Sequence, residues 1–401
     1  MDITSVVEKR SGVQVPLLLL ALASGVSWGL IWSILAPFLR GLGYSGAEYG
    51  ALGGSAVVIS ALFTMISGVL SDVIGAKRTI IIGLLAKVPS LLLIATGERS
   101  YVVAGFILNG VSQGLLWTAE TTLVSRSGVD ERLHYTFSYV GAVHMLGGAA
   151  GSFMGWIPVL ASRAYGVDVI EAYRATLQIL AIAPLAVILA ASRIRELGVS
   201  GGSVVDAIRG FRGLGAFYKL AFFNVLIGFG AAMSIHNIDY YFTVKFKTTS
   251  AELGSVFGLQ QLFMGLIMIR LPRLADRFGG PLRVYLALTL PSIPLLVAMT
   301  FTHSYIIASS LYLVRSILMN VANPLFNAFA MSLVPVEKRG VASAFISLSW
   351  TIPAGGGRAV GGYLLDIDIE LPLRLTALLY AVSLSGMGYV FKDSLSKSWV
   401  D

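Results

Sequence analysis

The chain has 401 residues, of which 56% are hydrophobic and 12% are charged, and its formal net charge is +8. This composition excludes a water-soluble domain of such length, because too many apolar side chains would face water, and it indicates a protein that lies in a membrane. The lack of cysteine excludes disulfide bonds, thiolate metal sites and cysteine nucleophiles.

Apolar runs recur along the whole chain, and a run of about 20 apolar residues crosses a bilayer as an α-helix. The runs lie near residues 16–39, 47–70, 78–97, 101–124, 135–160, 172–192, 217–242, 253–271, 284–302, 305–334, 341–365 and 373–391. We therefore predict an all-α membrane protein with twelve transmembrane helices. The first run is long enough to be a helix and lacks the short apolar core and cleavage site of a secretory signal, so we expect no cleaved signal.

One long polar segment interrupts this pattern, beginning at Arg193 after the sixth run. A linker between two six-helix halves would fall at this place. We predict an N-terminal bundle over 1–192, a cytoplasmic linker over 193–216 and a C-terminal bundle over 217–401.

A repeat of half the chain supports this division. Segment 68–78 reads GVLSDVIGAKR and segment 272–283 reads PRLADRFGGPLR, and each joins one apolar run to the next. Their aspartates, Asp72 and Asp276, are 204 residues apart, and a second corresponding pair, Arg132 and Arg339, is 207 residues apart. The spacing predicts two parallel repeats of six helices each.

The repeated segments resemble the Gly-x-x-x-Asp-Arg-x-Gly signature of the major facilitator superfamily, which links helices 2–3 and, in a degenerate form, helices 8–9. Val73 stands where the signature has Arg, and Pro272 stands where it has Gly. The resemblance implies two pseudosymmetric bundles that rock about a site near the middle of the bilayer. The sequence shows no phosphate loop, nucleotide motif or serine elbow, so we expect no enzymatic activity and no cofactor.

The resemblance also implies that these loops belong to a cytoplasmic gate. Asp72 lies at the end of the second helix, where its carboxylate can meet the positive N-terminal end of a helix from the other half. Such contacts would hold the halves together on the inside and break when the transporter opens inward. The alternative is that the loops are merely tight and positively charged. The predicted gate consists of Asp72, Gly75, Lys77, Arg78, Glu120, Arg132, Asp276, Arg277, Gly279, Arg283 and Arg339.

The distribution of Lys and Arg predicts the orientation. Nineteen of them lie at the two termini and in the connections after even-numbered runs, whereas seven lie in the connections after odd-numbered runs. We therefore expect a cell-membrane protein with both termini in the cytoplasm. The same asymmetry, with some contribution from membrane lipid, explains the net positive charge without nucleic acid as a partner.

Glycines recur at a spacing of four in the fifth run, at Gly147, Gly151 and Gly155, and a similar cluster in the eleventh run begins at Gly355. A face of small residues allows helices to approach closely. The cluster resembles the glycine-rich motif of antiporters in the family. Simple helix packing explains it equally well, so we infer no antiport from it.

Ionisable side chains inside transmembrane helices are costly, and they mark function or a local pair. His144 and Asp239 are the proton-coupling candidates; a packing histidine is the alternative for His144. Arg315 lies near the middle of the tenth run, and its partner is water, a polar group such as Asp239 or a carbonyl, or an anionic substrate. We exclude Lys87 from the site as a structural or snorkelling side chain. The substrate-binding candidates are Arg315, Trp28, Trp32, Asn109, Gln113, Trp117, Asn320, Asn323 and Arg358.

The sequence thus favours a secondary active transporter for a small organic solute, acting as a monomer and linked to protons, with efflux slightly favoured over uptake. The first run has no carboxylate of the kind that commonly binds cationic drugs in the family, so a neutral or anionic substrate is favoured. The four histidines lack metal-ligand spacing, and no metal is expected. A passive uniporter is the alternative within transport, and a receptor or lipid scramblase is the alternative outside it.

Overall fold

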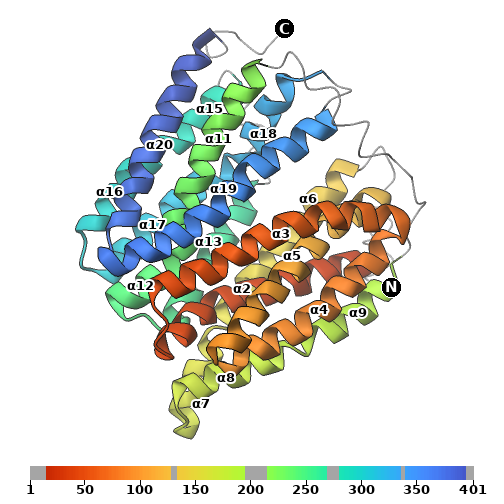
Figure 1. The fold of residues 1–401 in the computed structure, drawn as a ribbon, viewed down its shortest axis with the longest axis vertical. Coiled ribbons are helices and arrows are strands. Elements are labelled where there is room, and N and C mark those ends of the chain that lie inside the picture. Colours follow the sequence, from red (N-terminus) through yellow and green to blue (C-terminus); the bar gives the residue numbers. More distant parts are fainter. Residues whose placement is uncertain (1–14, 128–132, 195–214, 269–279, 336–338, 394–401) are drawn as a thin grey trace. The chain divides into compact units, whose positions relative to one another are not determined.

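The computed structural model describes residues 15–127, 133–194, 215–268, 280–335 and 339–393, and every regular element among them is helical (Figure 1). The helices of the first part of the chain are α2 (Val15–Gly41), α3 (Gly46–Val73), α4 (Ala76–Thr96), α5 (Arg99–Ser127), α6 (Leu133–Phe153), α7 (Trp156–Tyr165), α8 (Val169–Leu180) and α9 (Ala183–Ser192). Those of the second part are α11 (Gly215–Ser234), η2 (Ile235–Asn237), α12 (Ile238–Phe246), α13 (Ser250–Met268), α15 (Pro281–Thr289), α16 (Ser292–Phe301), α17 (Tyr305–Val321), α18 (Asn323–Ser332), α19 (Arg339–Ile367) and α20 (Leu371–Val390).

Ten helical stretches among the described residues are long and apolar enough to cross a membrane. Each of them falls on one of the predicted apolar runs, so the prediction of an all-α, multi-pass membrane protein is confirmed. The remaining two runs coincide with α13 and α19, which are helical but are not among the ten. Most of the predicted linker, from 195 to 214, lies outside the described residues.

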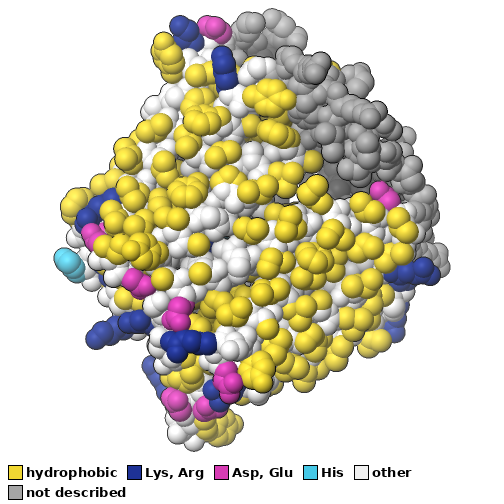
Figure 2. Space-filling model, in the orientation of Figure 1, with side chains coloured by type: hydrophobic (Ala, Val, Ile, Leu, Met, Phe, Trp, Pro, Cys, Tyr) yellow, Lys and Arg dark blue, Asp and Glu magenta, His cyan; other side chains and the backbone are white. Residues whose placement is uncertain are grey.

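The surface agrees with a lipid environment. Hydrophobic side chains are spread across the described part of the face shown in Figure 2, and Lys, Arg, Asp and Glu gather mainly toward its edges. Large aliphatic side chains such as Ile179, Ile182 and Leu189 are 70%, 62% and 67% exposed. Such exposure would be unfavourable in water and is favourable against lipid tails.

Short breaks divide several of the spans into two helices. The break between α15 and α16 lies at Pro291, and α18 carries Pro324 in its first turn; proline cannot donate the backbone hydrogen bond that would continue a helix. Between α11 and α12 the chain forms the 3₁₀ turn η2. This turn matters for the site because Asp239 is the second residue after it.

Contacts divide the chain into two units, which we describe separately. Unit 1 comprises Met1–Tyr44, Ser55–Gly202 and Lys247–Gly265. Within it α2 packs along α6, and α4 packs along α5. A Cβ added at Gly25 or Gly29 would collide with the α6 backbone, so these glycines allow α2 and α6 to approach closely. Leu20 of α2, Leu84 of α4 and Leu123 of α5 belong to one buried apolar cluster.

Unit 2 comprises Ser45–Gly54, Ser203–Phe246 and Leu266–Asp401. Within it α11 packs along α19 and α20, and α16 packs against α17 and α20. The first nine residues of α3 belong to this unit, and the rest of α3 belongs to unit 1. Conversely, residues 247–265, which the sequence analysis assigned to the second half, belong to unit 1. The predicted halves remain a proposal.

Candidate functional site

Asp239 is the most deeply buried carboxylate among the described residues of unit 2, with 2% exposure. It lies in the first turn of α12, immediately after the 3₁₀ turn, and accepts a hydrogen bond from the backbone N–H of Tyr240 at 2.8 Å. The hydroxyl of Tyr49, at the start of α3, donates a further hydrogen bond to its Oδ2 atom. The Tyr49 ring also stacks on Tyr240, with 5.1 Å between ring centroids. Asp239 is therefore held by groups from two helices.

Arg358 on α19 is the nearby cation. Its guanidinium carbon lies 5.5 Å from the centre of the Tyr49 ring, and its charge attracts the Asp239 carboxylate. A Cβ added at Gly53 would collide with this guanidinium, so Gly53 provides the space that it fills. The Asn237 side chain donates to the Arg358 carbonyl at 2.9 Å. These contacts bring together two predicted site residues, Asp239 and Arg358, from positions 119 residues apart.

Arg315 is also buried, with 2% exposure, on α17. Its Nη2 donates to the hydroxyl of Tyr380 on α20 at 2.6 Å, and its guanidinium carbon lies 5.4 Å from the centre of that ring. The Nε of Arg315 has no hydrogen-bond partner among the described residues. The sequence left the partner of Arg315 open, and it did not name Tyr380. The Nε–H donor of the guanidinium is therefore available to water or to a ligand that reaches this buried position.

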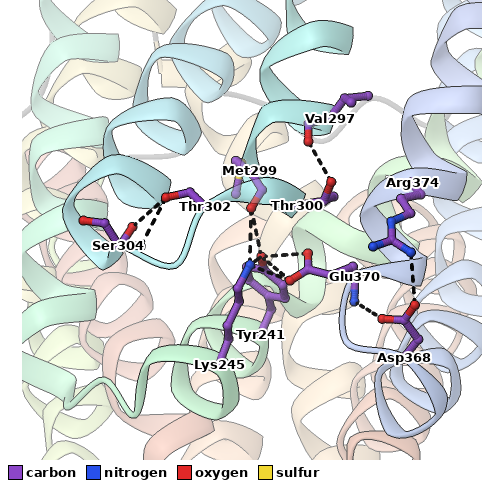
Figure 3. Close-up of polar contacts among 10 residues, drawn as sticks. All are labelled: Tyr241, Lys245, Val297, Met299, Thr300, Thr302, Ser304, Asp368, Glu370 and Arg374. Atoms are coloured by element: carbon purple, nitrogen blue, oxygen red, sulfur yellow. Dashed lines mark hydrogen bonds and ion pairs between the residues drawn. The ribbon is translucent and has the colours of Figure 1, made fainter.

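A second polar centre joins α12, α16 and the turn before α20 (Figure 3). Lys245 forms an ion pair with Glu370 at 2.5 Å, and both side chains are about nine-tenths buried. The Tyr241 hydroxyl donates to Glu370 at 3.1 Å, and Lys245 donates to the Met299 carbonyl at 3.4 Å. Sequence reasoning missed this centre because its two charges lie at separate helix ends. The DIDIE segment at 366–370, three carboxylates in five residues, was the available signal.

In unit 1, Glu120 and His144 have neutral hydrogen-bond partners. Glu120 on α5 accepts a hydrogen bond from the Ser24 hydroxyl of α2 at 2.9 Å. His144 on α6 is hydrogen-bonded to the backbone of Ala21, which lies one helical turn before Ser24 on α2. Two groups that can carry protons thus approach neighbouring turns of α2.

Lys87 is 7% exposed, and its ammonium donates to the side-chain oxygen of Asn109 at 2.5 Å. Lys87, which was excluded from the site on the basis of the sequence, therefore contacts Asn109, one of the predicted substrate-binding residues. Trp28 and Trp32 lie with 5.0 Å between ring centroids. Trp117 is 67% exposed.

The other substrate candidates have varied surroundings. Gln113 is half-buried on α5. Asn320 donates to the Ser316 carbonyl of its own helix at 2.8 Å, and Asn323 is exposed at the start of α18. Among the described residues these side chains make no shared contact with Asp239 or Arg315, and their role remains a prediction.

Part of the predicted gate lies within the described residues. Asp72 is half-buried one residue before the end of α3, and Gly75 (φ 93°) immediately precedes α4 in a conformation that favours glycine. Lys77 donates to the carbonyls of Ser192 and Ile194. These contacts place Lys77 at the C-terminal end of α9, where a cation is favourable.

The remaining gate residues are distributed as follows. Arg78 is exposed, Arg283 is exposed in the first turn of α15, and Arg339 donates to the Met331 carbonyl at 3.2 Å. Four predicted members lie outside the described residues: Arg132, Asp276, Arg277 and Gly279. Within the described ranges no group of three or more His, Cys, Asp and Glu side chains could hold a metal ion.

Comparison with known proteins adds independent information. The sequence matches the family model of the Major Facilitator Superfamily over residues 17–357. It is 27% identical over 131 residues to the quinolone resistance protein NorA of Staphylococcus aureus. That stretch covers 31% of this chain and 34% of NorA, so the chain spans about a third of the length of the curated relatives it matches.

Solved structures with a similar fold cover nearly the whole chain. A bacterial homologue of the human lysosomal transporter Spinster has a TM-score of 0.77 at 12% identity, covering 96% of this chain and 97% of that one. The xylose transporter XylE from E. coli has a TM-score of 0.74 at 13% identity, covering 96% of both chains. The nucleoside transporter NupG has a TM-score of 0.68 at 15% identity, covering 96% and 99%. At these identities the likeness shows the fold alone.

Proposed function

Because this chain belongs to the major facilitator superfamily, we propose that it is a secondary active transporter that moves a small organic solute across the cell membrane by alternating access, coupled to protons. Transport itself agrees with the family and with the transporters that share its fold. Proton coupling, the direction of transport and the solute class are the specific parts of the proposal.

The observation that supports proton coupling is the surroundings of Asp239. A carboxylate inside a membrane span is costly unless it is paired or has a function. Asp239 accepts the Tyr49 hydroxyl and lies near the Arg358 guanidinium. When ionised, it is stabilised by that cation; when protonated, it no longer attracts Arg358. Proton binding would thus loosen a contact between α12 and α19. His144 is the second proton-coupling candidate.

The substrate is proposed to be neutral or anionic. Arg315 keeps its charge at any accessible pH and retains an unbonded Nε donor among the described residues. A carboxylate or phosphate of a solute could accept that donor. We propose that Arg315 and Arg358 contact the solute, with Trp28, Trp32, Asn109, Gln113, Trp117, Asn320 and Asn323 as further candidates.

The direction is proposed to be efflux. The support is the local likeness to a quinolone resistance protein, because resistance due to a membrane transporter is typical of export. A passive uniporter is the alternative, in which Asp239 and Arg358 would be a structural pair. A receptor or lipid scramblase on the same fold is the alternative outside solute transport.

The proposed architecture has twelve spans, namely the ten apolar stretches together with α13 and α19. They would form halves at 1–192 and 217–401, joined by a cytoplasmic linker at 193–216, in a monomer with both termini in the cytoplasm. The cytoplasmic gate would include Asp72, Lys77 and Arg78, with Glu120 as a partner.

Transport in proteoliposomes tests the proposal. Purified protein is reconstituted with a pH-sensitive dye inside, and uptake of a fluorescent quinolone and of a small-molecule library is followed with and without an imposed pH gradient. We expect gradient-driven accumulation that Asp239→Asn abolishes while solute exchange persists, because exchange needs no net proton step. His144→Gln is tested beside it. Accumulation that still follows the gradient in the Asp239→Asn, His144→Gln double variant removes both residues from the coupling mechanism. Solute flux that is indifferent to pH in the wild type favours the uniporter.

A further inference from the structure

The rotation of α12 about its own axis is not set by the helix before it. α12 has nine residues, and the three residues of the 3₁₀ turn η2 separate it from α11. A 3₁₀ turn advances by about 120° per residue, against about 100° in an α-helix, so three such residues add a rotation of about 60°. The side chains of α12 therefore do not continue the faces of α11. Contacts with other helices of unit 2 must fix its rotation.

One face of α12 carries Asp239 and is held by α3 and α19. Asp239 accepts the hydroxyl of Tyr49 from the start of α3, and it lies in the field of Arg358 from α19. Tyr240 stacks on the Tyr49 ring. His236, in η2, lies in the field of the same guanidinium. The ionised form of Asp239 therefore depends on a donor and a cation that α12 must face.

The opposite face of α12 carries Tyr241 and Lys245. Residues two apart on an α-helix point about 200° apart, whereas residues four apart share a face. Tyr241 comes two residues after Asp239, and Lys245 comes four residues after Tyr241. Lys245 pairs with Glu370 at 2.5 Å, and the Tyr241 hydroxyl accepts from Lys245 at 2.9 Å and donates to Glu370 at 3.1 Å (Figure 3). α12 is thus held from both sides.

Glu370 belongs to a turn that has hydrogen bonds of its own. Its N–H donates to the Asp368 carboxylate at 2.9 Å, and the Leu371 N–H donates to the Asp368 carbonyl at 3.0 Å. Glu370 is 8% exposed. A buried carboxylate on a hydrogen-bonded turn is a fixed point against which Lys245 can hold α12.

We propose that Lys245 and Glu370 are positioning residues for Asp239: they fix the rotation of α12 so that the Asp239 carboxylate stays within reach of the Tyr49 hydroxyl and of the Arg358 charge. The inference rests on the proposed function, in which Asp239 binds the coupled proton. Without the pair, α12 can turn about its axis and carry Asp239 away from both groups. The ionised carboxylate then loses its donor and its cation.

Infrared difference spectroscopy tests the proposal without any solute. Spectra of the protein in lipid nanodiscs are recorded at successive pH values, and the protonated carboxyl band that Asp239→Asn removes is assigned to Asp239. The test variant combines Lys245→Met with Glu370→Met, so that neither charge is left unpaired. We expect the midpoint of this band to lie about one pH unit above that of the wild type. The pH at half-maximal proton-driven transport should move by the same amount.

Two further variants separate positioning from stability. Lys245→Arg keeps a cation that can bind the Glu370 carboxylate, so it should keep the wild-type midpoint. Arg374→Gln is the matched control, because it breaks the exposed pair with Asp368 and leaves Lys245 bound to Glu370. Its midpoint should also equal that of the wild type.

A wild-type midpoint in the double Met variant overturns the proposal even if this variant melts earlier, since the pair is then only structural. An equal shift in Arg374→Gln overturns it as well. Should the double variant fail to fold, Glu370→Asp keeps the charge on a side chain one methylene shorter and should give a smaller shift of the same sign; no shift overturns the proposal equally.

The outcomes distinguish this inference from the proposed function. A shifted midpoint in a protein that shows no proton-driven transport contradicts the proposed function alone. Proton-driven transport in a protein whose Asp239 midpoint is the same with and without the Lys245–Glu370 pair contradicts this inference alone. If the wild type shows no Asp239 band at any pH, Asp239 binds no proton and both proposals fail.

Discussion

Buried charges are balanced differently in the two units. In unit 2, carboxylates lie beside cations: Lys245 pairs with Glu370 at 2.5 Å, and Asp239 lies in the field of Arg358. Even Arg315, which forms no ion pair with the described residues, donates to a tyrosine hydroxyl. Each of these charges is therefore compensated by a group from another helix, and its removal leaves a buried partner behind.

In unit 1 the corresponding side chains bind neutral groups. Lys87 donates to Asn109 at 2.5 Å, and Glu120 accepts from Ser24 at 2.9 Å. No ion pair of Lys87 or Glu120 occurs within the described ranges. The number of charged residues in the sequence therefore does not show how much each charge contributes to the free energy of unfolding. Breaking a compensated pair should be costly, whereas removing an uncompensated charge should cost little.

The largest effect is expected at the Lys245–Glu370 pair. Glu370→Gln leaves a buried ammonium without its counter-ion, so we expect a loss of about 3–5 kcal/mol in the free energy of unfolding. Thermal or denaturant unfolding in detergent measures it. Lys245→Met combined with Glu370→Met should recover much of the loss, because neither charge then remains. Arg374→Gln, which breaks an exposed pair with Asp368 (side chains 51% and 43% exposed), is the control and should cost about 0–1 kcal/mol. Equal losses in the free energy of unfolding for Glu370→Gln and Arg374→Gln would contradict the expectation that the buried pair contributes more than the exposed pair.

A smaller effect is expected at Arg315. Tyr380→Phe removes the hydroxyl that accepts its Nη2 and should cost about 1.5–3 kcal/mol, because a buried charged donor loses its partner. Unfolding measurements test this expectation.

Substrate binding by Arg315 is a separate question. Arg315→Lys keeps the charge but loses the planar fork, so an anionic solute should show an apparent KM about tenfold higher, equivalent to about one charge-assisted hydrogen bond. Arg315→Gln distinguishes charge from geometry. Normal transport by Arg315→Lys, together with earlier melting of Arg315→Gln, would assign Arg315 to structure and remove the main support for an anionic substrate.

The smallest effect is expected at Lys87. Lys87→Met removes an ammonium that donates to the Asn109 amide, so the free energy of unfolding should stay within about 1 kcal/mol of the wild type or rise. Asn109→Leu alone should be more damaging, because it leaves the ammonium without an acceptor. The double variant should be close to Lys87→Met. Proton-driven transport is measured in parallel, and its loss in Lys87→Met would bring Lys87 into the mechanism.

The amino-acid sequence by itself determined the helical, multi-pass character of the protein and its family. Helix length and apolar composition are local properties, and the repeated Asp72 and Asp276 segments are readable without coordinates. The same local patterns singled out Asp239, Arg315 and Arg358, since a charge within an apolar run is conspicuous wherever it points.

Only the tertiary structure decided which groups these charges meet. Tyr380 was not a predicted partner of Arg315, Glu370 lies 125 residues from Lys245, and Asp366 reaches back to the start of α3 across 320 residues. Hydrophobic periodicity specifies that a helix crosses the membrane, but lipid tails are as apolar as a neighbouring helix. The choice of helix neighbours therefore depends on small-residue packing and on polar contacts between helices, which a single run of sequence does not contain.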